Sequence, residues 1–288
     1  MAIWNLGSIN LDIVHAVPHL PGAGETLMAT GVETYLGGKG ANMSVAAARA
    51  DAEVIHIGAV GADDGGWAVE RLEEDGVDIT YIAALDIPTS QALIFVDPDG
   101  ENTIVLAPGA SGEIPQALVQ EALTEASTGD WLVIQNETNL QRTAARIGRE
   151  LGLSVAYAAA PFDADRVEAV LPYLDFLILN AVEADQLQAA TGKAPEALGV
   201  ADVIVTRGAD GATWFGESGR RDFPAVKVKA VDTTGAGDTF TGYVLAGLDQ
   251  GDAMDVAITR AIKAAALMVT RHGTSDVIPS WEEVESFT

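Results

Sequence analysis

The sequence predicts a doubly wound α/β fold, in which helices cover both faces of a mostly parallel sheet, with two further segments that no helix covers. Short apolar stretches alternate with helical stretches along most of the chain, which is the pattern of a covered parallel sheet. The chain has 288 residues and 48% of them are hydrophobic. That is enough to bury one large core, so residues 1–288 are expected to form a single domain.

The expected elements of the sheet follow in chain order. Residues 2–8 and 54–59 are predicted strands, and residues 41–50 and 65–75 are predicted helices. Farther along, helical stretches separate four more predicted strands, at residues 131–135, 154–158, 176–179 and 203–206.

Two segments interrupt this alternation and are expected to lie outside the covered sheet. Residues 11–36 are rich in Pro, Gly and Thr, and residues 90–107 contain a hairpin around Asp97-Pro98-Asp99-Gly100, a strong turn signal. Neither segment has a helix to cover it. Apolar residues point to both faces of residues 92–96, so one face of this sheet needs a partner.

Composition excludes several classes of protein. A net charge of −26 repels nucleic acid and anionic lipid on average, so neither is an expected partner. The absence of cysteine excludes disulfides and thiolate metal sites, and the four histidines lack metal-ligand spacing. No apolar run approaches the roughly 18 to 20 residues of a membrane span, and no signal peptide is visible. We therefore expect a cytoplasmic protein without membrane partners.

The stretch Asp-Thr-Thr-Gly-Ala-Gly-Asp-Thr-Phe at residues 232–240 carries the most chemical information. A strand is predicted before it, at residues 226–231, and a helix after it, at residues 239–248. Glycines at a helix start leave backbone N–H groups facing one spot at the positive end of the helix dipole. Asp238 adds a carboxylate there, which could accept a proton from a hydroxyl that attacks phosphorus. The motif indicates phosphoryl transfer to an alcohol; alternatively, Asp238 is only the helix N-cap.

A second glycine-rich stretch runs from Gly37 into an alanine-rich helix. It is no Walker loop, because Gly40 follows Lys39 where Ser or Thr is required, and no dinucleotide fingerprint, because Met43 replaces the third glycine. Lys39 and Asn42 fall in the first helical turn, where they could hydrogen-bond a polyhydroxylated ligand. The alternative is a helix start packed tightly on the sheet.

Together these motifs resemble the signature of the ribokinase family, also called the phosphofructokinase-B family of sugar kinases. The resemblance extends over essentially the whole chain. Besides the two glycine stretches, it rests on four further elements and a lid entry, at residues 6–12, 21–26, 180–183, 206–211 and 269–273.

The resemblance implies an ATP-dependent sugar kinase in which residues 11–36 and 90–107 form a small β-sheet lid over the sugar. It also assigns roles to the matching residues. Asp238 would be the catalytic base, and its pKa need not be raised, because a helix N-terminus keeps a carboxylate ionised. The anion hole would comprise Gly235, Ala236 and Gly237. The sugar would be bound by Asn10, Asp12, Gly38, Lys39, Asn42, Glu137 and Asp238. The nucleotide would be bound by Asn180, Thr206, Arg207, Gly208 and Gly237.

The resemblance also implies two metal cofactors. Mg²⁺ would lie near Glu183, acting through water. K⁺ would lie among Asp232, Thr234 and the carbonyls of Val269, His272 and Thr274. Simpler interpretations remain open for three of these residues: Glu137 as a solvated carboxylate, Asn180 with Glu183 as a helix cap and its first-turn acid, and Asp232 as a turn cap.

The expected acceptor is a pentose, first of all D-ribose at its 5-hydroxyl, and the lids of two chains are expected to pair in a homodimer. Met43 stands where such kinases usually have glutamine, so fructose, deoxyribose, a ketodeoxy sugar acid or a nucleoside remains an alternative. A non-catalytic sugar-binding regulator is a further alternative. It is less favoured because Asp238, Gly235 and Gly237 are all present.

Overall fold

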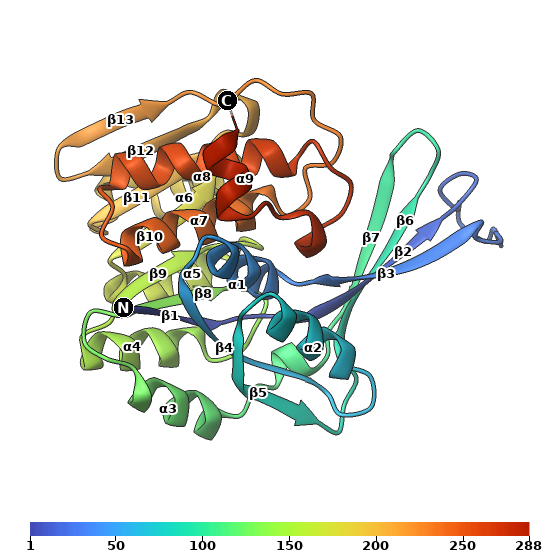
Figure 1. Cartoon of the computed structure of the whole chain (residues 1–288), viewed down its shortest axis with the longest axis horizontal. Coiled ribbons are helices and arrows are strands. Elements are labelled where there is room, and N and C mark those ends of the chain that lie inside the picture. Colours follow the sequence, from blue (N-terminus) through green and yellow to red (C-terminus); the bar gives the residue numbers. More distant parts are fainter. Residues whose placement is uncertain (288) are drawn as a thin grey trace.

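A nine-stranded sheet forms the centre of the computed structural model, which describes residues 1–287 (Figure 1). Its strand order is β13-β12-β11-β10-β9-β8-β1-β4-β5. The strands from β11 to β5 are parallel, and β12 and β13 add an antiparallel edge. The strands are β1 Ala2–Leu6, β4 Glu53–Gly61, β5 Asp78–Leu85, β8 Trp131–Gln135, β9 Ser154–Ala158, β10 Phe176–Asn180, β11 Asp202–Thr206, β12 Ala212–Gly216 and β13 Gly219–Phe223.

Helices cover both faces of this sheet, and each face has its own apolar core. Ile3 packs into one core and its neighbour Trp4 into the other, because successive side chains of a strand point to opposite faces. The first core lies under α1 Lys39–Arg49, α2 Gly66–Glu74, α7 Ala236–Asp249, α8 Met254–Met268 and α9 Trp281–Ser286. The second lies under α3 Gln116–Glu125, α4 Gln141–Leu151, α5 Ala164–Val170 and α6 Ala181–Thr191. The predicted doubly wound fold is confirmed. No helix within residues 1–287 is long and apolar enough to span a bilayer.

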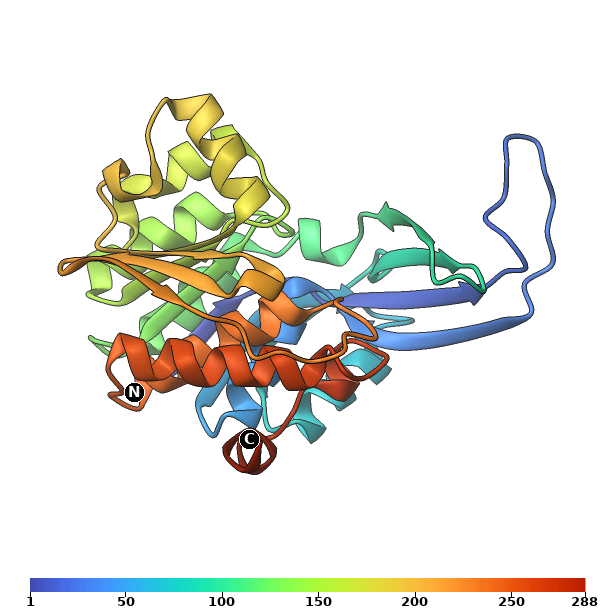
Figure 2. The same ribbon diagram turned by 90° about the horizontal axis from the view of Figure 1, so that it is seen from above.

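A second sheet of four strands projects from this body (Figures 1 and 2). We call it the lid sheet. Its order is β3-β2-β6-β7, with β2 Asn10–Ala16, β3 Gly31–Gly37, β6 Ser90–Val96 and β7 Asn102–Ala107. β6 and β7 form the predicted hairpin, and β2 pairs with β6 in parallel. The two segments that interrupt the βα alternation therefore supply all four strands of the lid sheet.

One predicted strand is wrong. Residues 226–231 are assigned no strand, because β13 ends at Phe223 as the edge of the sheet and nothing pairs with the chain beyond it. The backbone N–H groups of Val231 and Asp232 instead donate to the carbonyl of Val269, at 2.7 and 3.2 Å. The alternating pattern thus reflects an extended connection that ends on the segment after α8.

Candidate active site

The first turn of α1 is held by two side chains from the carboxyl ends of β1 and β8. Ser8 Oγ donates to Glu137 Oε2 at 2.6 Å, and the backbone N–H of Lys39 donates to the same oxygen at 3.0 Å. Gly40 N–H donates to Ser8 Oγ at 3.2 Å, and Ala41 N–H to the Ser8 carbonyl at 2.9 Å. Glu137 is therefore held by hydrogen bonds at the start of α1 and is not a solvated carboxylate. The helix start has no free donors left for a phosphate at these three positions.

Glycines let the chain segments of this site approach closely. A Cβ on Gly40 would lie 2.3 Å from the Cα of Gly7, and one on Gly37 would lie 2.1 Å from Asp12 Oδ1. Gly38 has a φ of 92°, which a side chain would strain. The predicted tight packing of this helix start is thus present, and it places the Asp12 carboxylate against Gly37.

Lys39 lies among buried and half-buried carboxylates that come from distant parts of the sequence, from Asp12 to Asp238. Its Nζ is 3.7 Å from Glu137 Oε1. The charge of Asp238 raises the pKa of Lys39 most, and those of Glu137, Glu183 and Asp12 also raise it. Burial in turn raises the pKa of Asp12 to about 7, while Lys39 opposes that rise. The site therefore holds one cation within a set of carboxylates.

Asp238 is a buried first-turn residue of α7 and not its N-cap. Gly235 takes the N-cap position with a φ of 75°, and Asp238 accepts a hydrogen bond from Asn42 Nδ2 at 2.9 Å. Burial raises the pKa of Asp238 to about 6, which corrects the expectation of an unraised value. The favourable helix position is outweighed by the loss of hydration.

The start of α7, unlike that of α1, leaves backbone donors unused. Thr239 N–H donates to the Gly235 carbonyl at 2.8 Å, and Ala236 N–H donates to the Thr233 carbonyl at 3.3 Å. Of the predicted anion hole, the N–H groups of Gly235 and Gly237 have no acceptor among the hydrogen bonds of residues 1–287, and neither has that of Asp238, whereas the N–H of Ala236 is already used. Free N–H groups at the positive end of a helix dipole are suited to binding an anion.

Two amides complete the sugar-side candidates. Asn42 Oδ1 is buried without a partner in the described part of the chain, although its Nδ2 donates to Asp238. Asn10 begins β2, opposite Gly37 in the antiparallel register, and is also buried. A buried amide oxygen without a partner is costly, so Asn42 has an acceptor available for a ligand hydroxyl.

The nucleotide candidates lie at the carboxyl ends of β10 and β11. Asn180 and Glu183 form a capping box on α6, so the simpler interpretation of this pair holds in the structure. Glu183 nevertheless lies near the site, because its charge contributes to the pKa values of both Lys39 and Asp238. Burial raises the pKa of Glu183 itself.

Thr206 ends β11 level with Asn180, and its Oγ1 donates to the Leu179 carbonyl at 3.4 Å. The guanidinium of Arg207 contacts Thr213 and Asp222 on the β12–β13 hairpin. Gly208, with a φ of 54°, follows directly. The guanidinium of Arg207 is therefore paired on the hairpin in this structure.

The potassium candidates come together, but not all of them fit a cation. Asp232 Oδ1 accepts from Thr234 N–H at 2.9 Å, as a turn cap does, and Oδ2 accepts from Gly273 N–H at 3.4 Å. The Val269 carbonyl already accepts two N–H groups, which leaves no lone pair for a cation. The Thr274 carbonyl accepts Val277 N–H at 3.4 Å, and that of His272 accepts none within residues 1–287. No group of three His, Asp or Glu side chains suited to a metal occurs in this part of the chain.

Sequence reasoning missed the role of Ser8. Its hydroxyl joins Glu137 to the start of α1, although 129 positions separate the two residues. Ser8 stands inside the first family motif, between the end of β1 and Asn10, so a small polar residue at a strand end was the available signal. No local pattern could have named its partner.

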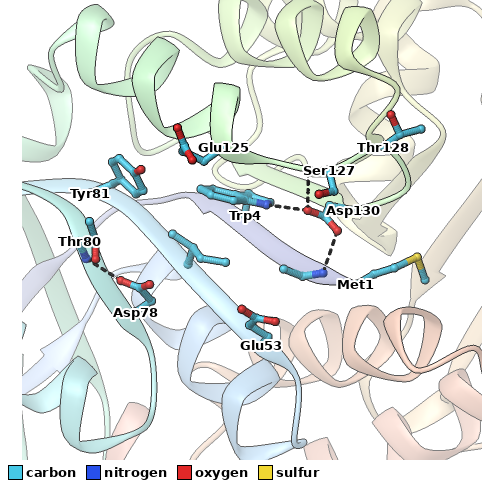
Figure 3. A pocket seen from close by; sticks show the side chains of 12 residues that line it. Met1, Trp4, Glu53, Asp78, Thr80, Tyr81, Glu125, Ser127, Thr128 and Asp130 are labelled. Atoms are coloured by element: carbon cyan, nitrogen blue, oxygen red, sulfur yellow. Dashed lines mark hydrogen bonds between the residues drawn. The ribbon is translucent and has the colours of Figure 1, made fainter.

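A hollow of about 570 Å³ lies at the opposite, amino ends of β1, β4 and β5 (Figure 3). Four carboxylates line it, from Glu53, Asp78, Glu125 and Asp130. Asp130 is fully used by the N–H groups of Ala2, Ser127 and the Trp4 indole. This hollow contains none of the predicted site residues, whereas the carboxyl ends of the strands bring most of them together, as in other open α/β sheets.

Comparison with known proteins agrees with this geometry. Residues 3–281 match the model of the pfkB family carbohydrate kinases. A curated relative, ribokinase from Haemophilus influenzae, is 34% identical over 296 residues, covering 98% of this chain and 96% of the relative.

Solved structures give the same result over the whole fold. The crystal structure of ribokinase from Thermotoga maritima has a TM-score of 0.91 and 33% identity, covering 100% of this chain and 99% of that one. Arabidopsis thaliana ribokinase, complexed with ribose and ATP, has a TM-score of 0.86 and 26% identity, covering 100% and 99%. The family match spans nearly all of the chain and its motifs meet in one site, so the protein belongs to the pfkB family of carbohydrate kinases.

Proposed function

We propose that the protein transfers the γ-phosphoryl group of ATP to the 5-hydroxyl of D-ribose. The observation that carries this proposal is the start of α7, where Asp238 lies beside two unused N–H donors, of Gly237 and of its own backbone. A carboxylate next to an anion site suits an acceptor hydroxyl and a transferring phosphate held together. The ribokinases among its relatives support ribose and ATP as the substrates.

The sugar would lie between the base of the lid sheet and the start of α1. Asp12 and Glu137 would accept its hydroxyl groups, Lys39 would donate to them, and Asn42 Oδ1 has an unused acceptor. Asn10 and the bare backbone of Gly38 complete the surface. Hydrogen-bonding positions on several sides favour a polyol over an analogue that lacks one of its hydroxyl groups, because the missing hydroxyl leaves a buried group unpaired.

In the reaction, the 5-oxygen of ribose forms a bond to the γ-phosphorus while the bond from that phosphorus to the β–γ bridging oxygen breaks. The proton of the hydroxyl passes to the Asp238 carboxylate, which is mostly ionised at pH 7 because its pKa is about 6. Asn42 Nδ2 holds the accepting carboxylate in place. The N–H groups of Gly237 and Asp238 stabilise the negative charge on the transferring oxygens.

The residues present fit Mg²⁺ through water better than by direct ligation. Glu183 uses Oε2 for the capping box, which leaves Oε1 for a hydrated ion beside Asn180. Mg²⁺ would neutralise phosphate charge in a protein whose net charge of −26 otherwise repels ATP.

For K⁺, Asp232, the Thr234 segment and the His272 carbonyl fit. The Thr274 carbonyl accepts one N–H and keeps one lone pair for a cation, whereas the Val269 carbonyl accepts two and does not fit. Rates in KCl, NaCl and tetramethylammonium chloride at equal ionic strength test this site. Faster turnover in KCl supports it, and identical rates in all three reject it.

We further propose that two chains pair through their lid sheets. The edge strand β7 exposes Ile104, Val105 and Leu106, each at least half exposed. Ile104 and Leu106 lie on the same face as Asp12, since they pair through β6 with Val14 and Asp12 of β2. An apolar edge strand of this kind is a surface that a second copy covers.

A coupled assay of ADP release over D-ribose, 2-deoxyribose, fructose, a ketodeoxy sugar acid and nucleosides tests the proposed function. Ribose is expected to give the highest kcat/KM. If the kcat/KM of another acceptor exceeds that of ribose by more than about tenfold, that acceptor replaces ribose as the proposed substrate, and the proposed kinase activity stands.

A further inference from the structure

The carbonyl of Leu36, at the base of the lid sheet, accepts two side-chain hydroxyl groups. Thr274 Oγ1 donates to it at 2.9 Å and Ser275 Oγ at 2.8 Å, and all three residues are buried. β3 is an edge strand of the lid sheet, so the outward carbonyls of this strand have no neighbouring strand to bond. The segment after α8 therefore takes the place of a neighbouring strand at this position.

Leu36 adjoins the surface assigned above to the sugar. Gly37 follows it and lies against the Asp12 carboxylate, and Gly38 and Lys39 come next. Any movement of the lid base on the main body thus displaces the Leu36 carbonyl and the hydroxyl groups bound to it.

The same segment also contacts the loop before α7. Gly273 N–H donates to Asp232 Oδ2 at 3.4 Å, and Asp232 Oδ1 accepts from Thr234 N–H at 2.9 Å. Thr234 directly precedes Gly235, the N-cap of α7. Two consecutive residues, Gly273 and Thr274, therefore bridge the phosphate side of the site to its sugar side.

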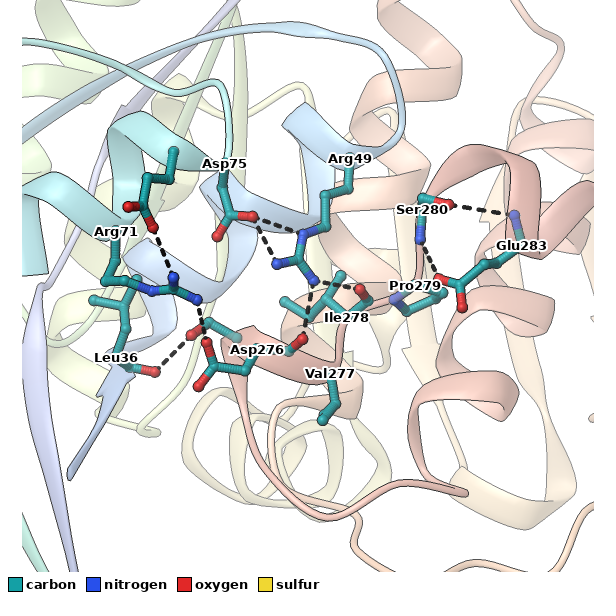
Figure 4. A network of polar contacts seen from close by, with 12 residues as sticks. Leu36, Arg49, Arg71, Asp75, Asp276, Val277, Ile278, Pro279, Ser280 and Glu283 are labelled. Carbon is teal, nitrogen blue, oxygen red and sulfur yellow. Dashed lines mark hydrogen bonds and ion pairs between the residues drawn. The ribbon is translucent and has the colours of Figure 1, made fainter. Parts of the chain in front are cut away.

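Two arginines hold the far end of this segment (Figure 4). Arg49 Nη1 donates to the carbonyls of Asp276, at 3.3 Å, and of Ile278, while Arg49 also pairs with Asp75. Arg71 Nη2 lies 2.7 Å from Asp276 Oδ1. Because these contacts hold Asp276 against α1 and α2, we expect a displacement at Thr274 to be passed to Gly273 more than to the residues downstream.

We infer that residues 273–275 couple sugar binding at the lid base to the geometry of the α7 start, with Thr274 and Ser275 as positioning residues. This inference rests on the proposed function of the same site. Binding of sugar would order the Leu36 carbonyl, its two hydroxyl donors, Gly273 and Asp232 in turn. Sugar would then raise the affinity for nucleotide, and nucleotide the affinity for sugar, by the same factor.

The test is isothermal titration calorimetry with the β,γ-imido analogue of ATP and Mg²⁺, with and without saturating D-ribose. In the wild type, ribose is expected to tighten analogue binding at least about fivefold. In the double variant Thr274→Val with Ser275→Ala, the factor is expected to fall below about twofold, with the Kd of ribose alone changed much less. The matched control is Thr270→Val, which removes a hydroxyl whose one hydrogen bond within residues 1–287 goes to the Leu267 carbonyl near the end of α8, and it should keep the wild-type factor.

A wild-type factor near one, or an unchanged factor in the double variant, would overturn the inference. If the double variant does not fold, Ser275→Ala alone leaves one hydroxyl on Leu36 and should give an intermediate factor; an unchanged one again counts against the link. Failure of every tested sugar to bind would reject the proposed function itself, whereas binding without coupling rejects only the link.

Discussion

The side-chain amide of Asn42 donates to the carboxylate of Asp238 at 2.9 Å, joining α1 to α7 across 196 positions of the chain. Its own oxygen, Asn42 Oδ1, is buried without a partner in residues 1–287. One amide thus holds the proposed base and leaves an acceptor for the substrate hydroxyl. The two glycine-rich helix starts are therefore joined in one place, where we propose that α1 supplies the sugar contacts and α7 the phosphate contacts.

Asp238→Asn should abolish turnover and leave ligand binding nearly intact. An asparagine can still accept the bond from Asn42 but cannot take the proton, so kcat should fall by at least about 10²-fold with little change in KM. Steady-state kinetics with ribose and ATP measure this. Asp249→Asn is the matched control, because Asp249 is a buried carboxylate at the other end of α7, and its kcat should stay near wild type. A tenth of wild-type kcat in Asp238→Asn would remove this residue from the mechanism.

Activity should fall on acidification between about pH 7 and pH 6. Burial raises the pKa of Asp12 to about 7 and that of Asp238 to about 6, and both carboxylates must be ionised, one to bind the sugar and one to accept the proton. The ionised forms dominate above these values and are lost below them. A profile of kcat/KM against pH reports the free enzyme. A flat profile down to pH 5 would be inconsistent with either role.

Lys39→Met should shift the acid limb of the pH profile, where activity falls on acidification, to higher pH. The charge of Lys39 lowers the pKa of both Asp12 and Asp238, so removing it lets burial raise both values further. Lys39→Arg keeps the charge and should leave the limb nearly in place. The two pH profiles are compared directly. A limb that stays, or moves to lower pH, in Lys39→Met would contradict the proposed electrostatics.

Asp249→Asn should stabilise the protein at pH 8 and not at pH 4. Burial raises the pKa of Asp249 to about 6, and its Oδ1 is buried without a partner among the described residues. A raised carboxyl pKa means that the folded state favours the protonated form. The ionised form therefore costs stability, and this cost appears as pH rises from about 4 through about 6. Melting temperatures at the two pH values test it, and an equal change at both would argue against a charge effect.

Leu106→Glu should separate a lid-paired dimer into monomers. Leu106 is 57% exposed on β7, and burying a carboxylate there would be unfavourable. Val256→Glu is the control, because Val256 is 44% exposed on α8 in the main body. Light scattering after size-exclusion chromatography gives the mass of each. A monomeric wild type, or a dimer that survives in Leu106→Glu, would reject lid pairing.

The sheet could be predicted from the sequence because its strands are short apolar runs between helices. Residues 131–135 and 154–158 form strands with the predicted bounds, and the hairpin at Asp97–Gly100 forms as its turn residues indicate. The wrong strand at 226–231 had the right alternation but no neighbouring strand. Strand pairing depends on a partner elsewhere in the chain, which a local pattern does not contain.

The sequence predicts which residues belong to the candidate site, but it does not predict the contacts that these residues make. Asp238 was named from the glycine turn, yet its raised pKa follows from burial that only the fold creates. Hydrogen bonds join segments more than a hundred positions apart: Ser8 bonds to Glu137, and Thr274 and Ser275 both bond to Leu36. Only the structure shows that the Val269 carbonyl already accepts two N–H groups.

The most direct test of the central claim is to identify the product formed from D-ribose and ATP with Mg²⁺ and KCl. Phosphorus and carbon NMR of the reaction mixture should show stoichiometric ADP and a phosphate ester on the 5-carbon of ribose. ADP release no faster with ribose, or with any other acceptor of the panel, than with water alone would contradict the account.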